Sequence, residues 1–301
     1  MSLIVGAYAA HPDELRQQFY QALAGVPSVR GLELPYGPYG GVRWPAGAPG
    51  NWSAVVTAIP GTMQRLKASP TFGLASGDAA GRTEALHFVA GIHALVLQLK
   101  KEGREVEAVE LHSAPYPGAD PSRFAESLEQ VLEWEWGATK LLVEHCDAPR
   151  PGGTPEKGFL PFGEEVDVLR SLREQAGGRV GLVINWARSV IETRDRDTAV
   201  EHIAHAREAG VLAGLIFSGC SPEETEFGYP WMDAHLPPVE VEGAPSSSLL
   251  NRAEISRCNK AAGNVPMHGF KIGLPRQGLS VEERVERLRQ MCALVEGDLP
   301  G

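Results

Sequence analysis

The chain has 301 residues, of which 43% are hydrophobic and 22% are charged, the balance of an ordinary globular protein. Its formal net charge of −10 at pH 7 would repel a nucleic-acid backbone or an anionic membrane surface. No apolar run approaches the roughly 18 to 20 residues that a membrane helix needs. We therefore expect no nucleic-acid partner and no membrane association.

Four cysteines are present, and none forms a CxxC pair or a zinc-type cluster. Four in a chain of this length is not the density of a disulfide-stabilised protein, so we expect a reducing, cytoplasmic location. The apolar first ten residues lack a basic start and are followed by Asp13 and Glu14. We interpret them as a strand rather than a signal peptide.

Eight short apolar runs alternate with longer amphipathic stretches, a pattern that predicts a parallel sheet covered by helices. Most of the runs are nearly continuous in Val, Ile and Leu, as strands buried on both faces are. The predicted strands are 3–9, 31–36, 54–60, 106–113, 140–148, 180–186, 212–219 and 265–272.

Helical periodicity occupies most of the connections, and several helices have a recognisable start. Ser280 is followed by Glu282 and Glu283, acids that suit the positive end of a helix dipole. The connection 37–53 is rich in Gly and Pro and has no helical period, so we expect no regular helix after strand two. The predicted helices are 12–24, 83–101, 122–136, 164–175, 197–209, 247–261 and 280–296.

Eight strand-then-helix units in about 300 residues predict a single-domain (β/α)₈ TIM barrel with parallel strands over 1–301. The alternative is a doubly wound open sheet, which would show a Gly-rich phosphate turn; no GxGxxG or P-loop occurs. Two connections are longer than the fold needs, 61–82 after strand three and 220–246 after strand seven. Both follow strands and fall on the face where barrels keep their sites.

Polar residues near the predicted strand ends should face the barrel axis, because the other face of each strand meets the apolar helix layer. Six strands direct polar side chains toward one region, which indicates a site rather than a structural core. Glu33 and Glu110 also have a simpler interpretation as ion-pair partners of Arg43 or Lys271. The inward-facing residues are Glu33, Glu110, His112, Glu144, Asn185, Ser218 and Lys271.

Other chemically suggestive residues are expected to be structural. His145 alternates with Glu144 and should face away from the axis, and Asp147 is expected to cap a helix or support its neighbours. Trp134 and Trp136 suggest internal packing or a contact within a homodimer. Structural roles are also expected for Cys146, Cys220, His87, His93, His202, His205 and His268.

Residues 220–246 are interpreted as a lid that excludes water when a substrate binds, with Gly219 and Gly228 as pivots. His235 in this segment is a candidate acid, base or ligand, unless it merely hydrogen-bonds Asp233. Aromatic residues near the mouth could stack on the apolar face of a sugar ring. They are Tyr36, Trp52, Trp186 and Trp231.

Several strand ends resemble those of the xylose-isomerase-like barrels. That superfamily contains sugar isomerases, sugar-phosphate epimerases and one class of abasic-site endonucleases, and the chain looks closest to an uncharacterised bacterial branch. The likeness rests on Gly31-Leu32-Glu33-Leu34-Pro35-Tyr36, Leu141-Leu142-Val143-Glu144-His145, Ile184-Asn185-Trp186-Ala187-Arg188-Ser189, Phe217-Ser218-Gly219-Cys220 and Trp231-Met232-Asp233-Ala234-His235-Leu236-Pro237.

The resemblance implies a divalent metal held by carboxylates and a histidine, with two glutamates serving proton transfer. Glu144 matches this pattern, but Asn185, Ser218 and Lys271 stand where an Asp, a His and a Glu are expected. An ammonium group there would repel a dication, so we expect the inherited metal site to be absent and assign no metal ligand. A relocated Mn²⁺, Mg²⁺ or Zn²⁺ site stays open as an alternative. It would draw on His112, Glu144, Asp147, Asp233 or His235.

The leading hypothesis is an isomerase or epimerase that acts on a small carbohydrate or polyol by proton transfer next to a carbonyl. Lys271 and Arg188 would supply the positive charge that a metal supplies elsewhere, and Glu144 or Glu33 the base. A Schiff base on Lys271 is disfavoured because nearby carboxylates keep it protonated. The predicted catalytic residues are Glu144, Lys271, His235 and Glu33, and the predicted substrate-binding residues are His112, Asn185, Arg188, Trp186, Ser218, Asp233 and Trp231.

Other functions compete with this hypothesis. The chain could be a non-catalytic carbohydrate-binding barrel, or a metal-dependent sugar isomerase with relocated ligands. Glycoside hydrolysis is a minor option, because strand seven ends at Ser218 with no acid before Glu223. An endonuclease is disfavoured by the acidic charge.

Overall fold

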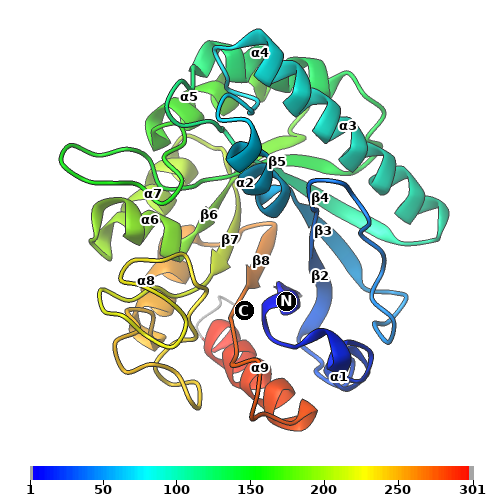
Figure 1. Ribbon diagram of the computed structural model, residues 1–301, viewed down its shortest axis with the longest axis vertical. Helices are drawn as coiled ribbons and strands as arrows, with labels where there is room; N and C mark the ends of the chain where they lie inside the picture. Colours follow the sequence, from blue (N-terminus) through cyan, green and yellow to red (C-terminus); the bar gives the residue numbers. More distant parts are fainter. Residues whose placement is uncertain (1–2, 298–301) are drawn as a thin grey trace.

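Eight parallel strands pair in sequence order and close into a barrel, since β8 also pairs with β1 (Figure 1). The computed structural model describes residues 3–297. The prediction of a (β/α)₈ TIM barrel is confirmed, although most strands end earlier than predicted. The strands are β1 Leu3–Val5, β2 Val29–Pro35, β3 Ser53–Thr57, β4 Glu105–Leu111, β5 Lys140–Glu144, β6 Val180–Asn185, β7 Leu212–Phe217 and β8 Met267–Phe270.

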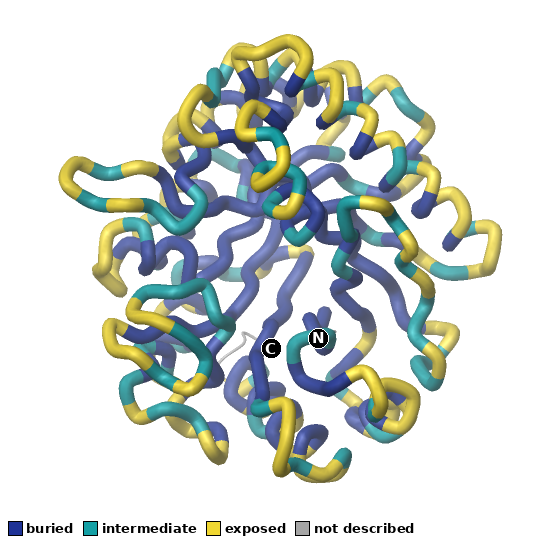
Figure 2. Tube along the Cα trace, viewed as in Figure 1, coloured by how far each residue is buried: buried dark blue, intermediate teal, exposed yellow. Residues whose placement is uncertain are grey.

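Helices surround the barrel, and their outer faces are exposed while the strands are buried (Figure 2). β2 runs to β3 without a helix, as predicted from 37–53. Within residues 3–297, no helix is both long and apolar enough to cross a membrane. The helices are α1 Arg16–Leu23, α2 Ile59–Ala68, α3 Ala79–Lys101, α4 Pro121–Leu132, α5 Phe162–Leu172, α6 Trp186–Thr193, α7 Asp197–Glu208, α8 Arg252–Ala262 and α9 Val281–Glu296, with 3₁₀ turns at Ala7–Ala9 and Asp13–Leu15.

Two short helices, α2 and α6, were not predicted. The sequence Ile59-Pro60-Gly61 is typical of a turn rather than a helix. Pro60 nevertheless lies in the first turn of α2, where a backbone N–H would have no partner within the helix, so its absence costs no hydrogen bond. Helix α6 begins directly after Asn185, at the end of an apolar strand, so no loop residues separate the strand from the helix in the sequence. The predicted start of α9 is confirmed: Ser280 and Glu283 form a reciprocal capping box.

The barrel interior is apolar toward the amino ends of the strands and polar toward their carboxyl ends. Interior side chains below the mouth form one cluster that contains Val55, Leu142 and Val183. Two residues further along β5 and β6 the inward positions hold Glu144 and Asn185. Because alternate residues of a strand share a face, the same pattern that fills the core carries polar groups to the carboxyl ends of the strands.

Candidate functional site

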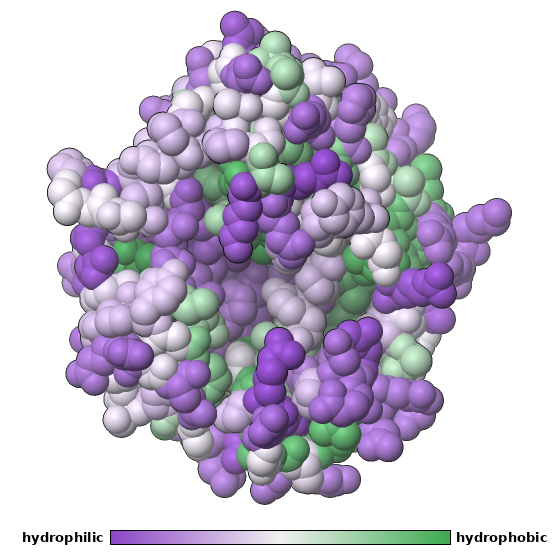
Figure 3. All heavy atoms as spheres, viewed as in Figure 1, coloured by the Kyte–Doolittle hydropathy of each residue, from purple (hydrophilic) through white to green (hydrophobic). Residues whose placement is uncertain are grey.

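Polar side chains from several strands meet at the mouth of the barrel. Glu33 comes from β2 and Glu144 from β5, while Lys271 directly follows β8. All three are almost completely buried. Seen from the face in Figure 3, the molecule is hollowed at its centre, and the floor of the hollow is largely hydrophilic.

Lys271 bridges the two acids. Its Nζ atom donates to Glu33 Oε1 at 2.9 Å and to Glu144 Oε1 at 2.8 Å. Burial alone would lower the pKa of Lys271, but Glu144 and Glu33 raise it well above its ordinary value. Gly6 leaves room for the bridge, because a Cβ atom there would lie 2.6 Å from Lys271 Cβ and 2.9 Å from Glu33 Oε2.

Glu144 is surrounded by donors on both carboxylate oxygens. Besides Lys271, its Oε1 accepts a hydrogen bond from Asn185 Nδ2 at 3.1 Å. Its Oε2 lies 3.1 Å from His112 Nε2 and 2.5 Å from Arg188 Nη1. Although burial would raise the pKa of Glu144, Arg188 and Lys271 hold it well below its ordinary value. Such a carboxylate is an anchor for cations rather than an effective base.

The amide of Asn185 is oriented by Ser218. The Ser218 hydroxyl donates to Asn185 Oδ1 at 2.8 Å, so the amide nitrogen is turned toward Glu144. Ser218 and Asn185 therefore position Glu144 through a chain of hydrogen bonds, and both are fully buried.

The network continues into the connection after β7 through Asp233. Asp233 Oδ2 accepts from Lys157 Nζ at 2.7 Å and from Arg188 Nε at 3.1 Å, and Oδ1 lies 3.3 Å from His235 Nδ1. Burial would raise the pKa of Asp233, but Lys157 and Arg188 hold it well below its ordinary value. Arg188 thus joins Glu144 in the barrel to Asp233 in the expected lid.

Lys157 was not anticipated from the sequence. It lies in the Gly- and Pro-containing connection between β5 and α5, and its side chain is only 8% exposed. The one available signal was its place in a strand-to-helix connection on the site face. Its neighbour Asp147 holds this connection by accepting the backbone N–H groups of Glu156 and Lys157, the supporting role expected for it.

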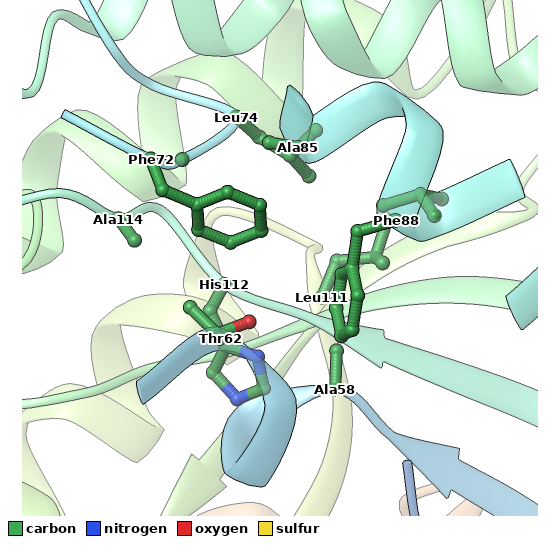
Figure 4. A pocket seen from close by; sticks show the side chains of 11 residues that line it. Ala58, Thr62, Phe72, Leu74, Ala85, Phe88, Leu111, His112 and Ala114 are labelled. Carbon is green, nitrogen blue, oxygen red and sulfur yellow. The ribbon is translucent and has the colours of Figure 1, made fainter. Parts of the chain in front are cut away.

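His112 is a neutral imidazole beside this network. Burial is the main reason that its pKa falls to about 4, although Glu144 opposes the shift. Its Nδ1 has no hydrogen-bond partner among the described residues. Figure 4 shows the ring beside Thr62 at a cavity of about 10 Å³ that Phe72 and Phe88 also line, with space for about one water molecule.

Two further polar groups lie beside the network: Glu110, which is buried, and Tyr8, which is half-buried. Neither carboxylate oxygen of Glu110 has a hydrogen-bond partner among the described residues, and burial followed by the charge of Glu144 raises its pKa well above its ordinary value. Burial and the lack of hydrogen-bond donors within residues 3–297 both favour the neutral form of Glu110. Burial and the charge of Glu33 also raise the pKa of Tyr8, a residue that the sequence did not suggest.

A pocket of about 500 Å³ opens beside Tyr8. It lies between the start of the chain and the connection after β2, and it also includes Arg16, Arg43 and Trp44. Arg43 does not pair with Glu33, whose partner is Lys271, and Arg16 is paired with Asp13. Tyr8 therefore connects this pocket to the charged network.

The structure corrects the expectation for several aromatic residues. Trp186 does not reach the mouth, because as the first residue of α6 it is fully buried in the apolar layer between barrel and helices. Trp52 and Tyr36 are also buried in that layer. Trp231 stays half-buried in the connection after β7, where the Arg194 guanidinium lies 4.9 Å from its ring centre.

The donors around Glu144 do not fit a divalent cation. Lys271 Nζ lies between the two acids that would be metal ligands, and Arg188 faces the remaining oxygen of Glu144. A dication placed there would be repelled by both cationic groups. The five residues of the relocated alternative do not gather either: within residues 3–297, the cluster with three metal-compatible donors consists of His145, Glu192 and His202.

Comparisons with known proteins agree with this architecture. The chain is 36% identical over 251 residues to an uncharacterized protein of Salmonella typhimurium, covering 78% of this chain and 77% of that protein. Its fold is similar to a candidate xylose isomerase of Rhodospirillum rubrum, with a TM-score of 0.64 and 12% identity over 100% of both chains. It is also similar to D-psicose 3-epimerase, with a TM-score of 0.59 and 13% identity over 100% of both chains.

A candidate sugar phosphate isomerase/epimerase of Anabaena variabilis gives a TM-score of 0.56 at 12% identity over 99% of both chains. Sugar isomerase- and epimerase-like TIM barrels are thus among the structural neighbours, and at these identities the likeness concerns the fold. Residues 4–287 match a sequence family described as a domain of unknown function (DUF4862), and the chain belongs to that family.

Proposed function

We propose that this protein is an isomerase or epimerase that acts on a small carbohydrate or polyol by proton transfer next to a carbonyl. The observation that carries the proposal is the Glu33–Lys271–Glu144 bridge, which places acids and a cation at the carboxyl ends of the strands. The sugar epimerases and isomerases among its structural neighbours support the substrate class.

Glu33 is the better candidate for the base. Its Oε2 has no hydrogen-bond partner among the described residues, whereas both oxygens of Glu144 are engaged. His235 is the candidate for the second acid–base group, because its side chain, at 17% exposure, is the most accessible member of the network. Glu144 then holds Lys271 and Arg188 in place.

Lys271 is proposed to stabilise the oxygen on which negative charge develops. Its raised pKa keeps the ammonium protonated, so it can donate to a carbonyl or enediolate oxygen. The same protonation argues against attack by Lys271 on a carbonyl carbon. His112, Asn185, Arg188, Ser218 and Asp233 are proposed to position these groups, since most of their polar atoms are occupied within the network. Trp231 remains the aromatic candidate for stacking on a sugar.

The charge balance of the network favours an unphosphorylated substrate. The cations Lys157, Arg188 and Lys271 are matched by three carboxylates, those of Glu33, Glu144 and Asp233. His112, with its lowered pKa, adds no charge. A phosphate dianion would meet no uncompensated positive charge here, whereas sugar hydroxyl groups need none.

Residues 220–246 are proposed to act as a lid. Gly219, just before the segment, and Leu236, within it, exchange backbone hydrogen bonds, and Lys157 and Arg188 hold Asp233 from the barrel side. Closure of this segment over a ligand would exclude water from Lys271 and Glu33.

The test is deuterium wash-in from D₂O at the carbon next to the carbonyl, followed by NMR for a panel of aldoses and ketoses. We expect exchange with at least one sugar and a loss of about 10²- to 10⁴-fold in Glu33→Gln. Glu105→Gln, at the exposed start of β4, is the matched control and should exchange like the unaltered protein.

A carbohydrate-binding barrel without catalysis is the second candidate. The observation in its favour is the saturation of Glu144, which leaves it no capacity to act as a base. Thermal stabilisation by a sugar that shows no deuterium exchange would favour this candidate. If no sugar of the panel exchanged or stabilised the protein, both candidates would be contradicted.

A further inference from the structure

A second polar cluster lies outside the barrel, in the layer between the sheet and helices α5, α6 and α7. The positions of these three helices can be followed in Figure 1. His145 directly follows Glu144 at the end of β5 and points to the opposite side, away from the axis. Glu192 comes from α6 and His202 from α7. Each of these three residues offers one donor atom, and the three atoms lie within 4.8 Å of one another.

The ring of His145 is fixed by a carboxylate on its other side. Its Nδ1 lies 2.7 Å from Glu165 Oε2, and its Nε2 is aimed at Glu192 Oε2 at 3.0 Å. Glu165 is itself held by the Ser113 hydroxyl, which donates to Oε1 at 2.5 Å. A carboxylate on the far nitrogen is the arrangement that sets the tautomer and orientation of a metal-bound imidazole.

His202 is oriented by two further contacts. Its Nδ1 lies 3.1 Å from Ser189 Oγ, and its ring stacks on Phe162 at a centroid distance of 3.9 Å and an interplanar angle of 4°. Burial, followed by the nearby His145, lowers the pKa of His202 to about 3, so its imidazole is neutral. When Nδ1 donates its proton to Ser189 Oγ, the other nitrogen of the neutral imidazole has a free lone pair.

We propose that His145, Glu192 and His202 bind one Zn²⁺ ion, at a site separate from the barrel mouth. Two imidazoles and one carboxylate form a ligand set that zinc accepts, with water in the fourth position. Ligands about 2.0 to 2.1 Å from a tetrahedral ion lie roughly 3.3 Å apart, so the pair His145 Nε2 and Glu192 Oε2 needs little movement. Glu192, with a side chain 15% exposed, provides the entry from solvent.

The competing explanation is a metal-free ion cluster. Burial would lower the pKa of His145, but Glu165 and Glu192 raise it to about 10, so without a metal the ring carries a proton between two carboxylates. Zn²⁺ would replace the proton on His145 Nε2, and that proton would be released to solvent. His145 Nδ1 would keep its proton and continue to donate it to Glu165. The two explanations differ in whether the protein binds zinc through these residues.

The experiment is calorimetric titration of Zn²⁺ into chelator-treated full-length protein, with Co²⁺ absorption as a second readout of imidazole coordination. We expect one ion per chain, and His202→Ala should weaken binding at least about 10-fold. Glu165→Gln should weaken it about 10- to 100-fold through the lost orientation of His145. His205→Ala is the matched control: it lies on the same helix, one turn beyond His202, outside the donor set.

The result that would overturn the proposal is absence of saturable Zn²⁺ binding, or binding of equal strength in His202→Ala. Circular dichroism checks that each variant is folded. If His202→Ala does not fold, Glu192→Gln carries the same expectation, because it keeps the shape of a partly exposed side chain and removes one ligand charge.

Discussion

Lys271 and Glu144, 127 residues apart in sequence, meet across the barrel mouth at 2.8 Å. Neither side chain is exposed to solvent. Removing one member of a buried ion pair leaves the other charge without compensation, which commonly costs about 3 to 5 kcal/mol. The pair therefore governs both the stability of the mouth and the position of the cation in the candidate site.

Replacing Lys271 should test this dependence. In Lys271→Met, Glu33 loses its cationic partner and faces Glu144, so the free energy of unfolding should fall by about 3 to 5 kcal/mol in urea denaturation. The double variant Lys271→Met/Glu33→Gln should recover part of the loss, because the carboxylate that was left without a cation is gone, while Glu144 keeps Arg188. Lys260→Met, on the exposed side of α8, is the control. A loss below about 1 kcal/mol for Lys271→Met would contradict the account.

Glu110 should make stability fall as the pH rises. Its folded-state pKa is raised, so above the ordinary value near 4.5 the unfolded chain releases a proton that the folded protein retains. This favours unfolding by up to about 1.4 kcal/mol per pH unit until the folded-state pKa is reached. Glu110→Gln should remove this contribution to the pH dependence of the unfolding free energy.

Urea denaturation at pH 4, 6 and 8 measures the difference in unfolding free energy between Glu110→Gln and the unaltered protein. That difference should shift in favour of the variant as the pH rises. A constant difference across this range would show that Glu110 ionises normally in the folded protein.

Gly6 should not accept even one methyl group. The Cβ of Gly6→Ala would meet Lys271 Cβ at 2.6 Å and Glu33 Oε2 at 2.9 Å, so the bridge must shift. We expect a loss of about 1 to 3 kcal/mol in unfolding free energy, the usual cost of overpacking. Gly163→Ala, in α5, meets no atom within 4 Å and is the control, expected to be neutral or stabilising. Equal stability of the two variants would contradict the close packing at Gly6.

His235 should matter for activity more than for stability. Its φ of 55° suits Asn, so His235→Asn keeps the backbone while removing the imidazole. We expect deuterium exchange to fall about 10²- to 10⁴-fold while the unfolding free energy changes by less than about 0.5 kcal/mol. His87→Asn, on the exposed face of α3, should alter neither quantity. Full exchange activity in His235→Asn would remove this residue from the mechanism.

Much of the fold could be predicted because apolar runs and the alternation of side chains along a strand can be recognised in short stretches of sequence. Continuous apolar runs identified the eight strands, and alternation along β5 correctly separated inward Glu144 from outward His145. Helix α6 could not be separated from β6, because Asn185 ends one element immediately before the other begins. The assignment of Trp186 to the mouth failed for the same reason.

The pairing of Glu33 with Lys271 was one of the interpretations of the sequence, but most other contacts between distant segments could not be predicted. Lys157 and Asp233 are 76 residues apart on two connections, and only the closed barrel brings them to 2.7 Å. Likewise, the alternation of side chains along β4 predicts that Glu110 points inward. It does not predict that Glu110 lacks a hydrogen-bond partner among the described residues, because that depends on the stagger of neighbouring strands. The zinc-compatible cluster combines β5, α6 and α7 and has no fixed spacing in sequence.

We propose that Lys271, rather than a divalent metal, supplies positive charge at Glu33 and Glu144. The most direct measurement is deuterium exchange of a responsive sugar by chelator-treated protein, before and after adding Mn²⁺ or Mg²⁺. We expect equal exchange in both conditions and loss of exchange in Lys271→Met samples shown to be folded. Exchange that appears only with Mn²⁺ or Mg²⁺, and disappears in Glu144→Gln, would contradict it.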